Sequence, residues 1–384
     1  MIERRILLLT LVFNLMASGI SPQQKSSESV TDRLTSWLIP NEENRVTTLL
    51  IYFHLLVFSA MVVSGVDAIS PSGYNLLRWG ANFKASTLNG EAWRLLTSVF
   101  THSGFLSLLV NMLALLCIGT ILEPLLGRIS FLLVYVVSGI CGSVLSLWWH
   151  DLSITAGAAG AIFGLYGVFL ALMLPGNSLP KESPLLLLLT TAIFIVYNLA
   201  YDVKDGIDNA SHVGGLISGF MMGLMLLPSL KSLDYPILLR ANLIIVLLVF
   251  SLGIYSFYAY APDSVARYEN AMKKFSANEA IAMKAYRNPE EVNDHQWRKQ
   301  LSKVGIEHWN RNLSLLEGLT NLPEPLAGYV NQLRNYCILR RSVFRMRANS
   351  IGQQTDQYEE QIRNTNLEIE GILMELRKNR GREL

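Results

Sequence analysis

The chain has 384 residues, and a soluble protein of this length would form two or three domains. Only 16% of its residues are charged, 51% are hydrophobic and the mean hydropathy is +0.31, whereas a soluble domain is about 25% charged. Of the 62 Lys, Arg, Asp and Glu residues, 35 follow Pro262. This composition excludes a fully soluble enzyme and a long disordered protein. The net charge of +2 gives no electrostatic reason to expect nucleic-acid binding.

The first 45 residues allow several interpretations. Arg4 and Arg5 precede the apolar run Ile6–Ala17, a pattern typical of a signal peptide. The run is short for a membrane span. We therefore treat residues 1–45 as an N-terminal segment that is either a signal or signal-anchor, an interfacial helix or an extra span.

Seven apolar runs follow, each about as long as a bilayer-crossing helix, which needs about 20 residues. They are Val46–Val66, Leu95–Leu122, Ile129–Trp149, Thr155–Pro175, Ser183–Tyr201, Asn209–Pro228 and Pro236–Ala261. Most of the breaks between them are short, which favours an up-and-down helical bundle. The alternating ten-residue segments of a β-barrel are absent from the sequence. The predicted fold class is therefore all-α, a polytopic membrane bundle with a soluble helical C-terminal domain.

The longest connection, Asp67–Ala92, mixes aromatic and turn residues, which indicates an ordered piece at the membrane interface. The basic residues of the short loops weakly favour a cytoplasmic Arg45. With seven spans, the tail would then lie outside the cytoplasm. We expect four parts: residues 1–45, a six-span core 46–228, a seventh span 229–261 and a soluble tail 262–384. In the tail, apolar spacing predicts helices over Tyr268–Arg287 and Ala327–Arg347, and Gln354–Arg380 is also compatible with a helix.

Three local patterns stand out within the spans. Four glycines fall within eleven residues at the start of the fourth run, at positions 157, 160, 164 and 167. Small residues let membrane helices approach closely, so a tight helix crossing alone explains this pattern. The sixth run has Ser211, Gly215 and Gly219 at four-residue spacing, with His212 inside the stripe. An ionisable residue in a span indicates a functional site, although a histidine hydrogen-bonded to a neighbouring helix is the alternative.

The third pattern begins with Trp93-Arg94 and continues into the second run. There, Asn111 is an amide within an apolar helix. It must find a partner or pay a desolvation cost of about 1–3 kcal/mol.

Together these features resemble the rhomboid family of intramembrane serine proteases, over about Val46 to Pro228. The resemblance is carried by the Trp-Arg loop, the asparagine of span two, the GxxGAxFGLxG run of span four and the His-xx-Gly-xxx-Gly of span six. Each motif is weak alone, and four in register are specific. The seventh span and soluble tail look most like rhomboids of Bacteroidetes-type bacteria, which implies a multi-pass protein of the bacterial inner membrane.

The resemblance implies a Ser–His dyad that cleaves transmembrane protein substrates within the lipid bilayer. The nucleophile position is Ala159, His212 is the general base, and Phe163 is the aromatic residue on which the imidazole stacks. Asn111 and Ser107 occupy the oxyanion positions, where the family has asparagine and histidine. Gly157, Gly160 and Gly215 are supporting residues that permit close approach.

Two of these positions depart from the family pattern, because Ala159 replaces the serine and Ser107 replaces the histidine. A methyl group cannot attack a carbonyl, and loss of the serine costs on the order of a millionfold in a soluble serine protease. We therefore expect this chain to be catalytically inactive. Two origins stay open: a Ser-to-Ala variant of an active enzyme, or a natural pseudoprotease that binds transmembrane clients.

We expect no metal and no cofactor, because no metal-ligand spacing or phosphate loop appears in the sequence. A transporter is less favoured, since the sequence has no internal repeat.

Overall fold

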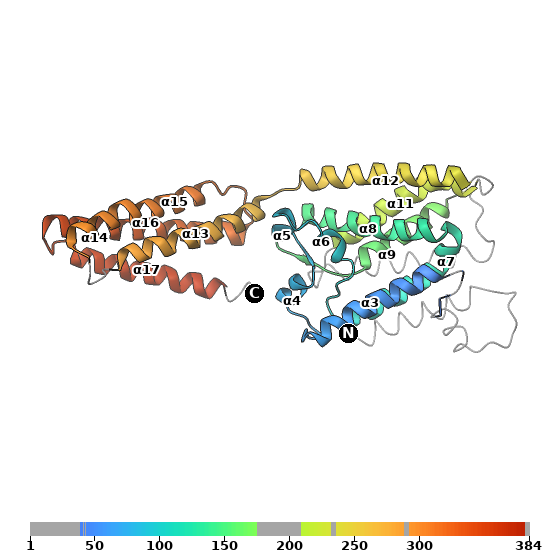
Figure 1. Cartoon of the computed structure of the whole chain (residues 1–384), viewed down its shortest axis with the longest axis horizontal. Coiled ribbons are helices and arrows are strands. Elements are labelled where there is room, and N and C mark those ends of the chain that lie inside the picture. The colour runs from blue at the N-terminus through green and yellow to red at the C-terminus, as the bar shows by residue number, and fades with distance from the viewer. Residues whose placement is uncertain are drawn as a thin grey trace. The chain divides into compact units, whose positions relative to one another are not determined.

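The computed structural model describes residues 39–40, 42, 44–174, 209–231, 236–287 and 292–380. The chain divides into two compact units, one up to Pro262 and one from Asp263 onward (Figure 1). Each unit has its own hydrophobic core.

The first unit is a bundle of apolar helices. Five described helices are long and apolar enough to cross a membrane. They are α3 (Arg45–Val63), α7 (Phe105–Leu126), α8 (Arg128–Trp149), α11 (Asn209–Lys231) and α12 (Pro236–Ala259). The shorter apolar helix α9 (Ala159–Leu172) lies among them (Figure 1). These helices confirm the predicted all-α polytopic membrane protein. The predicted span Ser183–Tyr201 and nearly all of the N-terminal segment lie outside the described residues.

Two predicted span boundaries were wrong. The run from Leu95 to Leu122 is not one helix, because α6 (Arg94–Thr97) is separated from α7 by a loop. Gly104 in this loop has φ +137°, and a Cβ there would lie 2.5 Å from the Ile69 carbonyl oxygen. The run from Thr155 begins in a strand, β2 (Ile154–Thr155), so α9 starts only at Ala159. Apolar composition alone does not show where an apolar run leaves a helix and continues as a loop or a strand.

The long connection after α3 is ordered, as predicted. It contains α4 (Gly73–Arg78), β1 (Asn82–Phe83) and α5 (Lys84–Leu88). The two strands pair antiparallel, with Asn82 opposite Thr155. The buried Arg94 side chain ties the connection together, because its Nη1 donates to the carbonyls of Leu77 at 2.6 Å and Ala81 at 3.0 Å. The connection is therefore joined to the segment that leads into α9.

Helix α9 forms the centre of the first unit. Every residue from Gly160 to Phe169 is buried, and α9 packs against α7, α8 and α11. A helix that is apolar on all sides belongs in the interior of a bundle rather than at its surface. The start of α9 is consequently enclosed by residues from several helices.

A buried carboxylate holds α3 against α7. Glu123 on α7 accepts the backbone N–H of Val46 through Oε1 and that of Thr47 through Oε2, both at 2.8 Å. Its Oε2 also accepts the Thr47 hydroxyl at 2.8 Å. The first N–H groups of a helix have no partner within the helix, and a negative charge near them is stabilising. Glu123 therefore supplies the cap for α3 from another helix.

The second unit contains α13 (Ser264–Tyr286), α14 (Asp294–Gln300), the π-helical turn η1 (Leu301–Gly305), α15 (Ile306–Glu317), α16 (Glu324–Gln353) and α17 (Glu359–Arg380). Trp309 and Phe344 are fully buried in its core. Helices α13, α16 and α17 were predicted from the sequence, and the segment from α14 to α15 was not. Burial raises the pKa of the Cys337 thiol to about 12, so this cysteine is a core residue rather than a reactive thiol.

Candidate active site

The residues singled out in span four lie at the N-terminal end of α9. Ala159 is the first residue of the helix, and no side chain caps this end at Ala158. Gly157 has φ +134°, a conformation that favours glycine, and its N–H donates to the Ser98 carbonyl at 2.9 Å. The backbone therefore enters α9 through a fixed turn that leaves the first N–H groups of the helix without a side-chain cap.

Asn111 and Ser107 lie next to this turn. A Cβ added to Gly157 would lie 3.7 Å from Asn111 Nδ2 and 4.0 Å from Ser107 Oγ. The Asn111 amide donates to the Ser107 carbonyl at 2.9 Å, and its Nδ2 is 3.5 Å from Ser107 Oγ. A primary amide has two N–H groups, and both contacts of Asn111 Nδ2 are to Ser107, the one to the hydroxyl being long.

His212 on α11 is stacked on Phe163 of α9. The two ring centroids are 4.6 Å apart and the ring planes differ by 1°. His212 is 6% exposed and Phe163 is 1% exposed. The imidazole is thus held in one plane by packing.

Backbone contact between α9 and α11 makes this stacking possible. A Cβ on Gly215 would lie 1.9 Å from the Gly160 carbonyl oxygen, and one on Gly219 would lie 1.9 Å from that of Gly164. At Gly160 itself, a Cβ would be 2.7 Å from Ser211 Oγ. Side chains cannot be accommodated at these crossings, and small residues are the usual means of close approach between membrane helices. The glycines of both motifs therefore face one another.

The arrangement holds an imidazole near the start of α9, where position 159 carries a methyl group. Residues four apart share one face of a helix, so the side chain of residue 159 lies one turn from Phe163, on the face that carries the stack with His212. A hydroxyl there would have an imidazole nearby to accept its proton. Ala159 offers only a methyl group. The uncapped N–H groups of α9 and the Asn111 amide are the kind of donors that stabilise an oxyanion.

A polar network behind the turn was missed in the sequence. Thr155 Oγ1 is hydrogen-bonded to Ser146 Oγ at 2.8 Å, and the opposite strand residue, Asn82, donates to the Ser143 carbonyl at 2.9 Å. The Thr87 hydroxyl donates to Asn82 Oδ1 at 2.7 Å. Short polar side chains gave no distinctive pattern in the sequence, because their partners are 5 to 61 positions away.

The network continues to the seventh predicted span. Tyr258 on α12 donates to the Thr87 carbonyl at 2.9 Å, and Trp148 on α8 donates to the Phe257 carbonyl at 2.8 Å. Asn242 fixes the other end of α12 by donating to the Met225 carbonyl at 2.6 Å. Although much of α12 is exposed, both of its ends are attached to the bundle.

Two further histidines are buried in the first unit. The side chains of His54 and His102 are both fully buried, and their ring centroids are 5.1 Å apart. His54 Nε2 is 2.7 Å from the Tyr135 hydroxyl. Burial lowers the pKa of His102 to about 4, so its imidazole is neutral at physiological pH. Within the described ranges, no cluster of three or more His, Cys, Asp or Glu could hold a metal ion.

The part of the chain that carries these residues is similar to known proteins. Residues 89–229 match the model of the Rhomboid domain, a range that includes α7, α8, α9 and nearly all of α11. The chain is 36% identical to the Putative rhomboid protease YdcA of Bacillus subtilis over 155 residues, which are 40% of this chain and 72% of that protein. It is 30% identical to the Rhomboid protease GluP of the same organism over 334 residues, which are 80% of this chain and 63% of that protein.

Plant relatives match over a shorter part. RHOMBOID-like protein 6, mitochondrial, of Arabidopsis thaliana is 38% identical over 160 residues, which are 41% of this chain and 52% of that protein. The chain thus spans about half the length of the first plant relatives it matches. The resemblance to Bacteroidetes-type rhomboids stays a prediction. From the domain match, the relatives and the apolar bundle, the chain belongs to the rhomboid family of integral membrane proteins.

Proposed function

We propose that the start of α9 forms a rhomboid-type endopeptidase site that binds transmembrane segments but does not cleave them. The observation that carries the proposal is the stacked Phe163–His212 pair on the α9 face whose position 159 holds a methyl group. The base is buried and positioned, and the nucleophile is absent. Such a site retains its affinity for substrate and loses the covalent step.

Each residue has a stated role in this proposal. Ala159 is the nucleophile position, His212 is the general base, and Phe163 positions the base. Asn111 is the oxyanion donor, with Ser107 in place of the histidine of the family. Gly157, Gly160 and Gly215 permit the turn and the helix contact. The Ser107 hydroxyl lies beside Asn111, so it is a partial replacement for the missing donor.

Restoring the serine at position 159 and the histidine at position 107 tests the catalytic part of the proposal. The Ala159→Ser, Ser107→His chain in detergent micelles should cleave a transmembrane substrate and react with a fluorophosphonate, which labels activated serines. Adding His212→Ala should abolish both signals, because the hydroxyl then loses its base. The chain with Ala159 is the control for background labelling. Labelling that is unchanged by His212→Ala would contradict the assignment of the base.

Client binding is the second function to test, because the resemblance keeps every site residue except those at positions 159 and 107. Photocrosslinkers placed in α7 at Val110 should capture transmembrane proteins from intact membranes. Capture should be insensitive to His212→Ala and should be lost when Gly219→Val displaces α11. Absence of any captured transmembrane protein would count against a natural pseudoprotease. The codon at position 159 in the source genome decides whether the alanine is native.

We place the protein in the bacterial inner membrane with the second unit outside the cytoplasm. The support is the loop charge pattern and the seven predicted spans, which put the tail opposite Arg45. Alkaline phosphatase fused after Ala261 should be active, because the enzyme matures only outside the cytoplasm. The same enzyme fused after Gly127 should be inactive. The reverse pattern would overturn this orientation.

A further inference from the structure

A buried lysine in the connection before α6 is paired with an aspartate that follows α8. Lys84 is the first residue of α5, and its side chain is 2% exposed. Its Nζ contacts Asp151 Oδ1 at 2.7 Å, and no second carboxylate of the described chain lies within ion-pair distance of it. A buried ammonium is costly unless it is paired. The position of Asp151 is therefore linked to that of Lys84.

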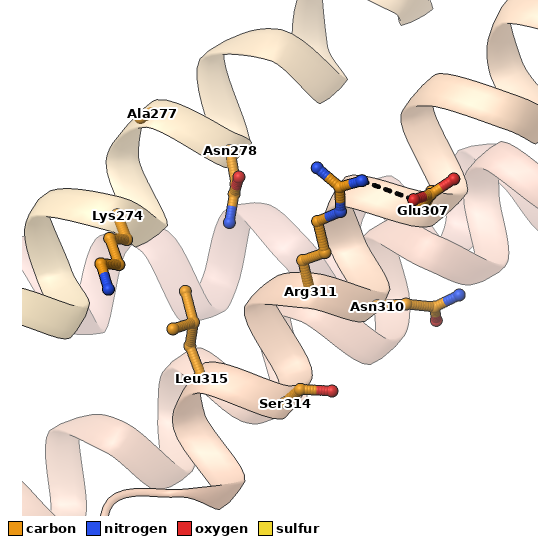
Figure 2. Close-up of a pocket in the computed structure, with 8 residues that line it drawn as sticks. All are labelled: Lys274, Ala277, Asn278, Glu307, Asn310, Arg311, Ser314 and Leu315. Atoms are coloured by element: carbon orange, nitrogen blue, oxygen red, sulfur yellow. Dashed lines mark hydrogen bonds and ion pairs between the residues drawn. The ribbon is translucent and has the colours of Figure 1, made fainter.

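This contact differs from the charged groups at the surface of the second unit. In the groove between α13 and α15, Arg311 is directed at Glu307, and Lys274 lies apart from both (Figure 2). The Arg311 and Glu307 side chains are both more than half exposed, and exposed pairs contribute little to stability. The Lys84 ammonium is withdrawn from solvent, where the attraction between opposite charges is screened much less.

Asp151 lies in the segment that leads from α8 into α9. Three residues after it, β2 begins at Ile154, which pairs with Phe83 of β1. Two residues after the end of β2, the Gly157 N–H donates to the Ser98 carbonyl at 2.9 Å. The segment 151–157 is thus attached at three places, and in each the partner belongs to the stretch 82–98.

Of these three attachments, the ion pair is the one between charged groups. The strands β1 and β2 are each two residues long, and a two-stranded ribbon is marginally stable by itself. The bond from Gly157 is a neutral backbone bond, and hydrogen bonds between charged groups are stronger. Loss of the ion pair should therefore loosen the segment while the apolar core of the bundle stays packed.

We propose that Lys84 and Asp151 are positioning residues for the site at the start of α9. Their ion pair fixes the segment 151–157, and this segment sets where residue 159 lies relative to His212. A displacement of about 1 Å at a reacting group can cost about 100-fold in rate. The part that concerns residue 159 rests on the function proposed above, whereas the attachment of the segment by the ion pair does not.

Hydrogen exchange followed by mass spectrometry tests the attachment in the full chain with Ala159, in detergent micelles. Lys84→Met keeps the stem and removes the charge, so the amides of residues 151–157 should exchange at least about tenfold faster. The amides of α7 and α11 should be unaffected. The control is Arg78→Met, which removes an exposed cation of the same connection and should leave exchange unchanged. Equal exchange in the two variants, or faster exchange throughout the bundle, would overturn the proposal.

A variant of the partner shows whether the two residues act through one contact. Asp151→Ala should speed the exchange of the same amides. The double variant Lys84→Met, Asp151→Ala should then exchange no faster than the faster of the two single variants, because each removes the same interaction. Effects that multiply in the double variant would mean that the two residues act separately, and the proposal would be wrong.

The link to residue 159 is tested in the chain restored by Ala159→Ser and Ser107→His. Lys84→Met should lower the maximal rate of fluorophosphonate labelling by about tenfold or more and leave the concentration for half-maximal rate unchanged. Loss of folded protein would instead lower the final labelled fraction. If the restored chain is not labelled even with Lys84, the function proposed for α9 fails, and the exchange measurement still decides whether the ion pair holds the segment. An unchanged rate in a restored chain that is labelled would overturn the positioning role.

Discussion

The contact between His212 and Phe163 shows how much of this site depends on a single pair of side chains. A parallel ring contact restricts the rotation of the imidazole, and an aromatic pair is worth about 0.5–1.5 kcal/mol beyond the area it buries. The same pair would remain in place whether residue 159 is alanine or serine, because the ring contact does not involve it.

We predict that Phe163→Leu lowers the rate of fluorophosphonate labelling of the Ala159→Ser, Ser107→His chain by about 2- to 10-fold. Phe163→Tyr should keep the rate, since it keeps the ring. The measurement is the labelling rate as a function of pH, because a misplaced base changes the profile as well as the maximum. Equal rates for Phe163, leucine and tyrosine would show that the stack does not position His212.

Glu123 provides a second prediction at the scale of one residue. Glu123→Gln keeps the shape of the side chain but replaces an anion that accepts three hydrogen bonds near the start of α3. We expect a loss of about 1–3 kcal/mol in stability, seen as a lower thermal midpoint in detergent. The control is Glu269→Gln in the second unit, where the side chain is part of an exposed pair and the midpoint should not move.

The packing of α9 against α11 is a property of whole elements, because backbone meets backbone along several turns. Gly215, Gly219 and Gly167 each leave less than 2.5 Å for an added Cβ before a carbonyl oxygen. Helix α12 behaves differently, since nothing lies within 4 Å of a Cβ added at Gly253. We therefore expect a glycine-to-alanine substitution to have opposite effects on stability in α11 and in α12.

We predict that Gly219→Ala destabilises the bundle by about 1–3 kcal/mol, because the methyl group forces α11 away from Gly164. Gly253→Ala should leave the thermal midpoint unchanged or raise it, since alanine is the better helix former by up to about 1 kcal/mol. Thermal unfolding in one detergent compares both variants. A similar loss for the two glycines would mean that the close contact with Gly164 is not the cause.

The attachment of α12 to the rest of the bundle is a second property of whole helices. Tyr258→Phe removes the bond to the Thr87 carbonyl and should cost about 1 kcal/mol. Tyr255→Phe, on the same helix but 68% exposed, should be neutral. The readout is the thermal midpoint together with the labelling rate of the restored chain. If Tyr258→Phe changes neither quantity, α12 does not contribute to the stability of the connection that contains Thr87.

At the scale of the whole molecule, the separate core of the second unit predicts independent folding. Trp309 and Phe344 are buried among residues of the second unit only. The isolated segment 263–384 should therefore be soluble, helical by circular dichroism and cooperative in thermal unfolding. Trp309→Ala should lower its midpoint strongly, since truncating a buried tryptophan costs about 3–5 kcal/mol. A segment without cooperative unfolding would contradict the division at Pro262.

The sequence alone determined the apolar bundle, the approximate spans and the family, because hydropathy and motif spacing are local properties of the chain. It also identified Ala159, His212, Phe163 and Asn111, since each lies within a motif of a few residues. Span ends were less accurate where apolar residues continue into a loop, as between α6 and α7.

Only the tertiary structure decided which distant groups meet. The pairing of Asn82 with Thr155, the burial of His54 against Tyr135 and the bond from Tyr258 to the Thr87 carbonyl join segments far apart in the chain. Such contacts depend on helix rotation and on the depth of each crossing. A stripe of glycines fixes how close two helices come, but the side chains that then face each other follow from the packing of the whole bundle.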